Sequence, residues 1–400
     1  MKNIGEASVF TCTGCGACKA ICPVNAIDYQ LTENGFFEAS VNLDKCVNCG
    51  LCQKVCYKYV STDLMGKSIF EGTAVSARSS SKEIVHSCTS GGVAYEIARW
   101  GIDNHYTVAG TIYDYKTNQA KMSLATTLQE IELFKGSKYL QSKSDEAIKQ
   151  LIEKAKSEPE SKFIAFGTPC QILGIRRAFE VSKLKNELIL VDLFCHGVPS
   201  YLTWKSYLKE RGYSDLKNVQ FRSTKLPWHF FGLELENSEG KHELLPSARS
   251  SFYQLFFENI GLHNSCSNCM VRKEMSSADI RLGDYWGRKY RKNFDGISAC
   301  VAATEKGFEI LKKLQSIGVL SILDQEKIFN ITQSQSVSDY QLICKLNSQN
   351  YFVCLKETQS LKSAKRSCRK TFSTKSKNII KLVISFLPIK LQMEIRKNFK

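Results

Sequence analysis

Apolar residues beyond about residue 80 alternate between short runs that suit buried strands and longer stretches with helical spacing. Three apolar runs, 105–114, 162–179 and 187–200, each begin as a strand and pass into a turn with glycine or proline. Helical spacing is found between them, at 144–157 and 201–212. Strand, turn and helix in succession predict an α/β domain with a central sheet. Ligands of such sheets bind at the carboxyl ends of the strands, where these turns fall.

The first 65 residues have a different pattern, because closely spaced cysteines dominate them. The runs 12–22 and 46–56 each hold four cysteines, separated by two, two and three residues. Gly14, Gly16 and Gly50 give the loops backbone freedom. A loop of this spacing supplies three thiolates to a [4Fe-4S] cube, and the fourth thiolate comes from the other run. Each run therefore needs the other.

This crossing predicts two ligand sets, one of Cys12, Cys15, Cys18 and Cys56, the other of Cys46, Cys49, Cys52 and Cys22. Pro23 follows the first run, as the two-cluster arrangement requires, whereas Tyr57 stands at the equivalent place in the second. Zinc is the alternative, but a tetrahedral site needs neither the third cysteine nor the following proline. Residues 1–65 therefore resemble a bacterial-type ferredoxin, a small α+β module that moves one electron at a time.

The composition also indicates in which cellular compartment the protein is found. The chain has 400 residues and 17 cysteines, and neither a basic start followed by an apolar region nor an apolar stretch of membrane-spanning length is present. We therefore expect a cytoplasmic protein, whose thiols stay reduced and serve metal or redox chemistry.

The net charge of +16 is concentrated near the end of the sequence. Residues 356–400 carry +11, which leaves +5 for the other residues. Because no zinc-finger, RNA-recognition or helix-turn-helix signature is present, we expect no nucleic-acid partner. We assign 336–400 to a basic C-terminal extension, in which 377–400 has the pattern of a basic amphipathic helix. Such a helix either lies on an anionic inner-membrane surface or packs on the protein with its basic side in water.

Further candidate chemistry lies at strand ends of the larger domain. Ser90, Gly91 and Gly92 precede an apolar helix, where free N–H groups favour a phosphate, although a simple helix cap is the more frequent explanation of such a turn. Four more cysteines, two at strand ends and two in a CxxC, make a further complete set of thiolates: Cys170, Cys195, Cys266 and Cys269. We infer a third cluster from them. The remaining cysteines, including Cys88, are expected to be packing residues or exposed thiols.

Eight ordered motifs between about residues 80 and 330 resemble the beta subunit of coenzyme F420 hydrogenase/dehydrogenase. They are SGGVAYEIARW, GSKYLQS, GTPCQILGIRR, CHGVPS, FRSTKLPW, SCSNCMVR, ADIRLGDYWG and GISACVAATEKG. We assign 80–335 to this domain. Two positions depart from the pattern: Cys88 stands where relatives often have Ser, and Pro227 where Gly is common.

The resemblance implies an α/β flavin-binding domain with a central mixed sheet, FAD, a neighbouring iron–sulfur cluster formed by the four cysteines of the third set, and hydride exchange with a soluble redox partner. On matching positions, Ser90, Gly91 and Gly92 would cradle the FAD phosphates. The flavin or substrate pocket would be lined by Gly136, Ser137, Lys138, Tyr139, Thr168, Pro169 and Gln171.

Together these features predict an iron–sulfur flavoprotein oxidoreductase. Single electrons would pass from a protein such as ferredoxin through the clusters to FAD, and from there to a small-molecule substrate or a deazaflavin-type cofactor. Candidate catalytic side chains are His196, Arg222 and Lys225. Two alternatives remain: an electron-carrying subunit that serves a separate catalytic partner, and a zinc-stabilised interaction protein.

Overall fold

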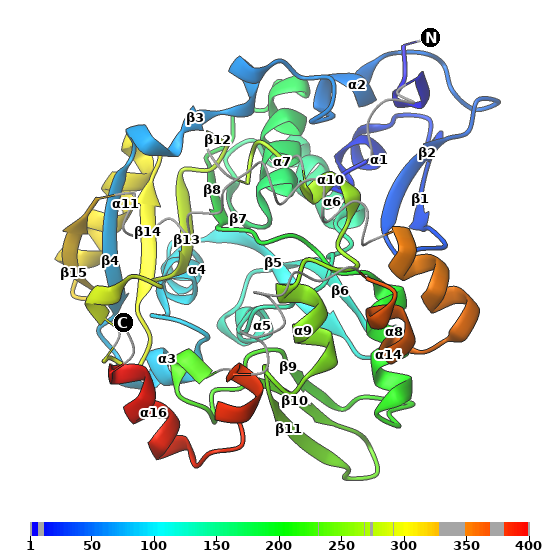
Figure 1. Ribbon diagram of the computed structural model, residues 1–400. Coiled ribbons are helices and arrows are strands. Elements are labelled where there is room, and N and C mark those ends of the chain that lie inside the picture. Colours follow the sequence, from blue (N-terminus) through cyan, green and yellow to red (C-terminus); the bar gives the residue numbers. More distant parts are fainter. Residues whose placement is uncertain are drawn as a thin grey trace.

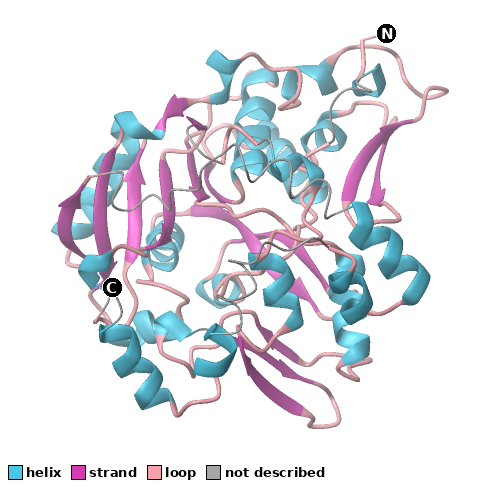
Figure 2. Ribbon diagram, viewed as in Figure 1, coloured by secondary structure: helices cyan, strands magenta, loops and turns pink. Residues whose placement is uncertain are grey.

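The computed structural model describes residues 2–6, 12–230, 232–267, 269–272, 275–290, 292–327, 349–368 and 380–398 (Figure 1). It shows an N-terminal ferredoxin-like module followed by an α/β domain with a large mixed sheet. Figure 2 shows the strands of this sheet running from one edge of the molecule into its centre, with helices on both sides. Cys344, one of the unassigned cysteines, lies outside the described residues.

The ferredoxin-like module consists of two matching halves. Its elements are η1 (Ile4–Glu6), α1 (Ala17–Ile21), β1 (Ile27–Leu31), β2 (Phe37–Val41), α2 (Leu51–Val55) and η2 (Thr62–Met65). Helices α1 and α2 begin after Gly16 and Gly50, both with positive φ, and end at Cys22 and Cys56. The cysteine repeat in the sequence is therefore a structural repeat. Strands β1 and β2 pair antiparallel.

The large sheet has eight strands, in the order β15 (Leu320–Glu326), β4 (Thr73–Ser79), β14 (Ser298–Ala302), β13 (Ile280–Asp284), β8 (Leu188–Leu193), β7 (Lys162–Phe166), β5 (Tyr106–Asp114) and β6 (Gln119–Ala125). Pairing is parallel from β13 through β8 and β7 to β5, and antiparallel elsewhere. The predicted mixed sheet is thus confirmed. Strand β4 precedes residue 80, so the sheet begins earlier than the predicted boundary.

Alternate residues of the central strands bury opposite faces of the sheet. In β7, Phe163 and Ala165 pack on the face covered by α6 (Asp145–Ser157) and α7 (Pro169–Val181), while Ile164 packs on the opposite face. That opposite face is covered by α4 (Val93–Asp103) and α11 (Glu305–Ser316). Because the strands are apolar on both faces, helices must cover both. The predicted strands and helices at 105–114, 144–157 and 201–212 are confirmed.

The ferredoxin-like module has no separate core. Its buried residues Cys15, Ala17 and Val55 belong to the same apolar cluster as Ile172 and Ile175 of α7. The module therefore packs directly against the helices that cover one face of the large sheet (Figure 1).

A smaller sheet and additional helices complete the fold. The sheet has the order β11 (His242–Pro246), β10 (Gly232–Glu236), β9 (Asn218–Gln220), and it packs near α8 (Tyr201–Glu210) and α9 (Ser251–Phe257). The remaining elements are β3 (Lys67–Ser68), which pairs with β12 (Met275–Ser276), and η3 (Ile69–Glu71), α3 (Lys82–Ser87), α5 (Leu128–Glu132), η4 (Trp228–Phe230), α10 (Asn264–Ser267), η5 (Arg288–Tyr290), α14 (Leu361–Arg366) and α16 (Ile389–Asn398).

Two features of the predicted C-terminal extension need correction. Residues 349–368 are part of the core, because Tyr351, Phe352 and Leu361 are buried against α8 and the β1–β2 hairpin. The described part of 377–400 is two helices, 380–384 and α16, interrupted before Pro388, which cannot continue a helix. Among the described residues, no helix combines the length and apolar character needed to cross a bilayer.

Candidate iron–sulfur and cofactor sites

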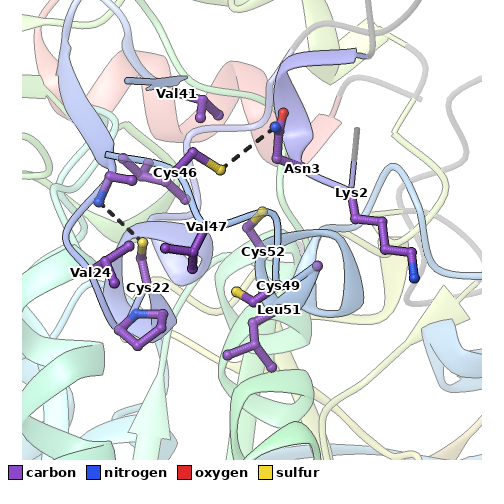
Figure 3. Close-up of a pocket in the computed structure, with 14 residues that line it drawn as sticks. Lys2, Asn3, Cys22, Val24, Val41, Cys46, Val47, Cys49, Leu51 and Cys52 are labelled. Atoms are coloured by element: carbon purple, nitrogen blue, oxygen red, sulfur yellow. Dashed lines mark hydrogen bonds between the residues drawn. The ribbon is translucent and has the colours of Figure 1, made fainter. Parts of the chain in front are cut away.

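The second predicted ligand set surrounds one hollow at the surface of the ferredoxin-like module. Cys22, Cys46, Cys49 and Cys52 all line it, and Figure 3 shows their sulfur atoms around the same space. The N–H of Ala26 donates to Cys22 Sγ at 3.2 Å, and the Asn3 amide donates to Cys46 Sγ at 3.7 Å. N–H donors at sulfur stabilise thiolates and tune cluster potentials. Cys49 is exposed, so this hollow is accessible to solvent.

The first predicted ligand set lies deeper. Cys15 and Cys18 are buried, and Gly14 N–H donates to Cys12 Sγ at 3.3 Å. Burial raises the pKa of the Cys18 thiol well above its usual value, and the neighbouring Cys15, Cys12 and Cys56 thiols raise it further. Cys56 and Cys52 of the second run are both among the neighbours of Cys18, and the assignment of Cys56 to the first set stays a prediction.

The four cysteines of the larger domain also meet. Cys170, Cys195, Cys266 and Cys269 line a single hollow, together with Thr13 and Gly14 from the first cysteine run. Burial raises the pKa of Cys170 well above its usual value, and Cys269 and Cys15 raise it further. The hollow thus adjoins the first ligand set. Cys170 lies in the first turn of α7, and Gly174, one turn later, has space only for hydrogen because Cys15 Sγ and Ala17 Cβ lie within 3.4 Å of the position that a Cβ would take.

Two arginines hold the CxxC loop against this hollow. Arg281 is fully buried, forms an ion pair with Asp192 through both carboxylate oxygens, and donates to the carbonyls of Val271 and Met275. Arg272 donates to the carbonyl of His196, beside Cys195.

Tyr57, which replaces the expected proline, also holds this loop. Its hydroxyl accepts from Met270 N–H at 3.0 Å, and its ring packs with Cys269 and Val271. The departure from the ferredoxin pattern therefore connects the end of the second cysteine run to the third thiol set. Nothing in the sequence around Tyr57 indicates such a role.

A cube of four irons and a single metal ion place different demands on their ligands. Within the described part of the chain, no three His, Cys, Asp or Glu side chains converge closely enough to hold one metal ion. Zinc ligands surround one atom, whereas the thiolates of a cube bind irons at separate corners and stand farther apart. Two of the predicted sets each line a common hollow, one of Cys22, Cys46, Cys49 and Cys52, the other of Cys170, Cys195, Cys266 and Cys269. Four thiolates are the donors that one iron–sulfur cube requires.

Only part of the predicted phosphate turn, residues 90–92, is available to bind a phosphate. Ser90 Oγ donates to the carbonyl of Ile297 at 3.0 Å, and Gly91 N–H donates to Ser298 Oγ at 3.1 Å. Both residues are therefore bonded to the start of β14 or to the residue just before it. A side chain at Gly91 would collide with this strand, since its Cβ would lie 2.7 Å from Ser298 N. Gly92, with φ of 80°, caps the 11-residue helix α4 and is the member of the turn left at a helix N-terminus.

The Gly136–Tyr139 segment lies beside that turn. Thr89 Oγ1 and Ser137 Oγ are 3.4 Å apart, and a Cβ added at Gly136 would meet nothing within 4 Å. Lys138 Nζ donates to three carbonyls at the end of α5, and burial lowers the pKa of Lys138 to about 7. Tyr139 packs among aromatic rings, with its centroid 5.2 Å from that of Phe256. This segment is open only at Gly136 and Ser137.

Thr168, Pro169 and Gln171 lie at the four-thiol hollow, which they help to line. Thr168 and Gln171 form a capping box at the start of α7, and Gln171 Nε2 donates to Ser142 Oγ at 2.8 Å. These bonds fix the turn that carries Cys170.

The three candidate catalytic residues are occupied by structural partners. His196 Nε2 lies 3.2 Å from the carbonyl of Phe256, and burial, with Arg272, lowers the pKa of His196 to about 4. Arg222 is buried and paired with Asp284. Burial alone would lower the pKa of Arg222, but the Asp284 carboxylate outweighs burial and raises it. Lys225 is bound to the buried carboxylate of Glu234.

Sequence reasoning also missed Gln141, although it lies in one of the ordered motifs. Its Oε1 accepts from Phe37 N–H at 2.6 Å, and its Nε2 donates to the carbonyls of Phe37 at 3.1 Å and Thr13 at 3.4 Å. Nearby, Ser144 Oγ donates to the Cys15 carbonyl at 2.9 Å. Polar residues that join two domains carry no local sequence signal.

Comparison with known proteins agrees with this arrangement. Residues 160–327 match the family model of the C terminus of the coenzyme F420 hydrogenase/dehydrogenase beta subunit, and residues 11–60 match a 4Fe-4S dicluster domain. The chain carries, over residues 160–327, a C-terminal domain of the coenzyme F420 hydrogenase/dehydrogenase beta-subunit family. It carries an iron–sulfur dicluster domain in front of the family domain, as its motifs predict.

Three known proteins are similar to parts of this chain. The beta subunit of coenzyme F420 hydrogenase from Methanococcus voltae is 25% identical over 255 residues, which are 62% of this chain and 82% of the relative. An uncharacterized protein of Methanocaldococcus jannaschii is 22% identical over 317 residues, 71% of this chain and 83% of the relative. An iron-sulfur subunit of CoB–CoM heterodisulfide reductase from the same organism is 40% identical over 58 residues, 11% of this chain and 9% of that relative.

The fold of this chain is also found in a solved structure. A chain of the xenon-derivatized F420-reducing [NiFe] hydrogenase complex from Methanosarcina barkeri superposes with a TM-score of 0.50 at 19% identity. The match covers 74% of this chain and 97% of the other.

Proposed function

We propose that this protein is an iron–sulfur flavoprotein oxidoreductase that conducts single electrons between a redox protein and FAD, for two-electron oxidation or reduction of a small-molecule substrate or deazaflavin-type cofactor. The observation that carries the proposal is the adjacency of the third thiol set to the first. Thr13 and Gly14 of the ferredoxin-like module line the hollow of Cys170, Cys195, Cys266 and Cys269.

The three thiol sets form a series in which the first set adjoins both of the others. Cys49 of the second set is exposed, Cys15 of the first set is buried, and Cys170 of the third set has Cys15 as a neighbour. The first and second sets are also neighbours, because Cys52 of the second set contributes to raising the pKa of Cys18 in the first. A redox protein such as ferredoxin would approach the exposed hollow, and the inner sets would be shielded from solvent.

FAD would be held where the α4 N-terminus meets the Gly136–Ser137 turn. Gly92 begins a helix long enough to favour a phosphate, and the open space at Gly136 admits a ligand close to the backbone. Ser90 and Gly91 would support this turn from β14 without contacting phosphate. When bound, iron–sulfur cubes supply one-electron transfer, and a flavin supplies the exchange between one-electron and two-electron chemistry.

The chain itself contributes position and exclusion of water. Arg281 and Arg272 hold the CxxC loop, Thr168 and Gln171 hold Cys170, and Tyr139 packs among aromatic rings of the larger domain. His196 would orient the Cys195 turn through its bond to Phe256, in place of the catalytic role expected from sequence.

Cofactor content tests the proposal. Protein purified without oxygen is expected to contain about 12 Fe per chain, four for each of three cubes, together with acid-labile sulfide and one FAD. About 8 Fe with no flavin would contradict both the third cluster and the flavoprotein assignment.

Replacing one ligand locates the third cluster. Cys195→Ala is expected to remove about 4 Fe per chain while leaving the spectroscopic signals of the two N-terminal clusters. Cys354→Ala, a half-buried cysteine in none of the three sets, is the matched control and should keep the full iron content. Equal iron in Cys195→Ala and the control would remove Cys195 from the ligand set.

A second candidate function is favoured by the names of the relatives, two of which are subunits of larger enzymes. In that case the chain is an electron-carrying subunit with no substrate chemistry of its own. Reduction of a one-electron dye by fully loaded, isolated protein with candidate two-electron donors distinguishes the two functions. Turnover supports the oxidoreductase, and inactivity that is relieved by a partner protein supports the carrier.

A further inference from the structure

Residues 380–398 are here named the C-terminal hairpin. In this hairpin polar side chains are buried and large apolar side chains are exposed, which is the reverse of an ordinary surface segment. Ser385 and Gln392 are buried, at 5% and 8% exposed. Val383, Phe386 and Leu391 are 59%, 66% and 47% exposed. Soluble proteins rarely present clustered large apolar side chains outward while polar ones face inward, and such clusters mark binding surfaces.

The hairpin is attached to the body of the protein, so its apolar side is presented in a fixed direction. Arg249 donates to the carbonyl of Ser385, and its guanidinium carbon lies 4.1 Å from the centre of the Phe386 ring. Gln392 Nε2 donates to the carbonyl of Leu387 at 2.7 Å, which closes the turn between the two helices. These bonds hold the hairpin in place, so its exposed apolar residues keep their outward orientation.

The charge around this surface is positive. Lys381 and Lys390 are exposed within the hairpin, where Glu394 is the single acidic residue of the sequence 377–400. That sequence contains six Lys and Arg residues, which gives it a net charge of +5. Apolar side chains bordered by lysine are the combination that binds the interface of an anionic bilayer.

We propose that the C-terminal hairpin binds the surface of anionic lipid membranes, with Ile380, Val383, Phe386 and Leu391 entering the interface and the lysines contacting headgroups. A bilayer fits better than a protein partner because the exposed apolar residues are bordered by exposed lysines, and Glu394 is the single acidic residue of the sequence 377–400. This inference is independent of the proposed redox function.

The position of the hairpin suits this role. In Figure 1, α16 lies at the bottom of the molecule and the ferredoxin-like module at the top right. A membrane bound by the hairpin would therefore leave the exposed Cys49 hollow open to a soluble redox protein.

Co-sedimentation with vesicles tests the proposal. Full-length protein, purified without oxygen, is mixed with vesicles rich in phosphatidylglycerol or made of phosphatidylcholine alone. We expect binding to the anionic vesicles, weaker binding to the zwitterionic ones, and loss of part of the binding at high salt, because salt screens the lysines.

Paired variants separate the two contributions. Val383→Asp with Leu391→Asp, and separately Lys381→Glu with Lys390→Glu, are each expected to weaken binding to anionic vesicles at least about tenfold. The matched controls are Ile317→Asp with Val353→Asp, which are 54% and 58% exposed, and Lys116→Glu with Lys185→Glu, which are exposed elsewhere. The apolar control should bind like the native protein.

Three outcomes would overturn the proposal. One is the absence of binding by native protein, and another is equal binding by the Val383→Asp, Leu391→Asp variant and its control. The third is a dimer, seen by analytical ultracentrifugation, that this variant abolishes while vesicles leave the native protein in solution. Iron and flavin content, measured on the same samples, reports the redox sites separately.

Discussion

At the scale of single residues, Arg281 is the side chain on which the third thiol set depends most. It is buried with Asp192, and the same guanidinium holds two carbonyls of the loop that follows Cys269. A buried pair stabilises little in total, but removal of one partner leaves an uncompensated charge in the interior.

Arg281→Met is therefore expected to lower the free energy of unfolding by about 3–5 kcal/mol and to reduce the iron content. Urea unfolding and iron analysis measure the two effects. Arg211→Met, which breaks an exposed pair with Glu243, is the control and should cost about 1 kcal/mol or less. Native iron content in a folded Arg281→Met protein would show that the loop is held by other contacts.

Residue identity also explains why the two cysteine runs differ. Gly14 and Asn48 occupy equivalent positions with φ of 65° and 53°. A Cβ on Gly14 would lie 2.0 Å from Nε2 of Gln141 in the larger domain, whereas the run that contains Asn48 lies at the surface. Glycine is required where the module packs on the larger domain, and asparagine suffices where it does not.

At the scale of elements, Gln141 connects the family domain to strand β2. Gln141→Leu keeps the shape of the side chain but leaves both backbone groups of Phe37 without their buried partner, at a cost of about 1–3 kcal/mol. We expect hydrogen exchange at the Phe37 amide to accelerate about tenfold or more.

Gln30→Leu on the neighbouring strand β1 provides the control, because Gln30 is exposed. Exchange measured by mass spectrometry on peptides that contain Phe37 would reveal the difference. Unchanged protection in Gln141→Leu would show that the module is held by its apolar contacts alone.

Elements also show what the sequence could predict. Apolar runs that end in glycine or proline gave β5, β7 and β8 because both faces of these strands are buried, and the cysteine spacing gave the ferredoxin-like module. Strands β9 to β11 were not predicted, since their short runs mix charged and apolar residues. The convergence of Cys170 with Cys266 could only be inferred, because contacts between distant segments leave no periodic signal.

Side-chain roles were the least predictable part. Arg222 and Lys225 looked available in sequence because their partners Asp284 and Glu234 lie on other strands. The topology of the fold decides that these two side chains pair with buried carboxylates and not with a ligand. The same applies to Ser90 and Gly91, whose partners lie about 207 residues later in the chain.

At the scale of the whole molecule, residues 349–368 belong to the body of the protein despite their position in a basic segment. Tyr351, Phe352, Leu355 and Leu361 are buried beside α8 and the β1–β2 hairpin. A chain that ends at residue 348 is expected to lose at least about 6 kcal/mol of stability, estimated as about 1.5–3 kcal/mol for each large apolar side chain. This is comparable to the total stability of many domains, which starts at about 5 kcal/mol.

A chain that ends at residue 368 keeps this core and should remain folded. Soluble yield and thermal unfolding of the two truncated proteins measure the contrast. Equal melting temperatures would show that residues 349–368 contribute little to the fold.

The shared core of Cys15, Ala17 and the α7 residues Ile172 and Ile175 has a kinetic consequence. A carrier domain on a tether must diffuse between donor and acceptor, so its turnover slows in viscous solvent. Here the spacing between the first and third thiol sets is set by folding. Electron transfer between these two sets should therefore be a first-order process whose rate changes neither with glycerol nor with dilution. Only the reaction with a redox protein at the exposed hollow of Cys49 should depend on collisions.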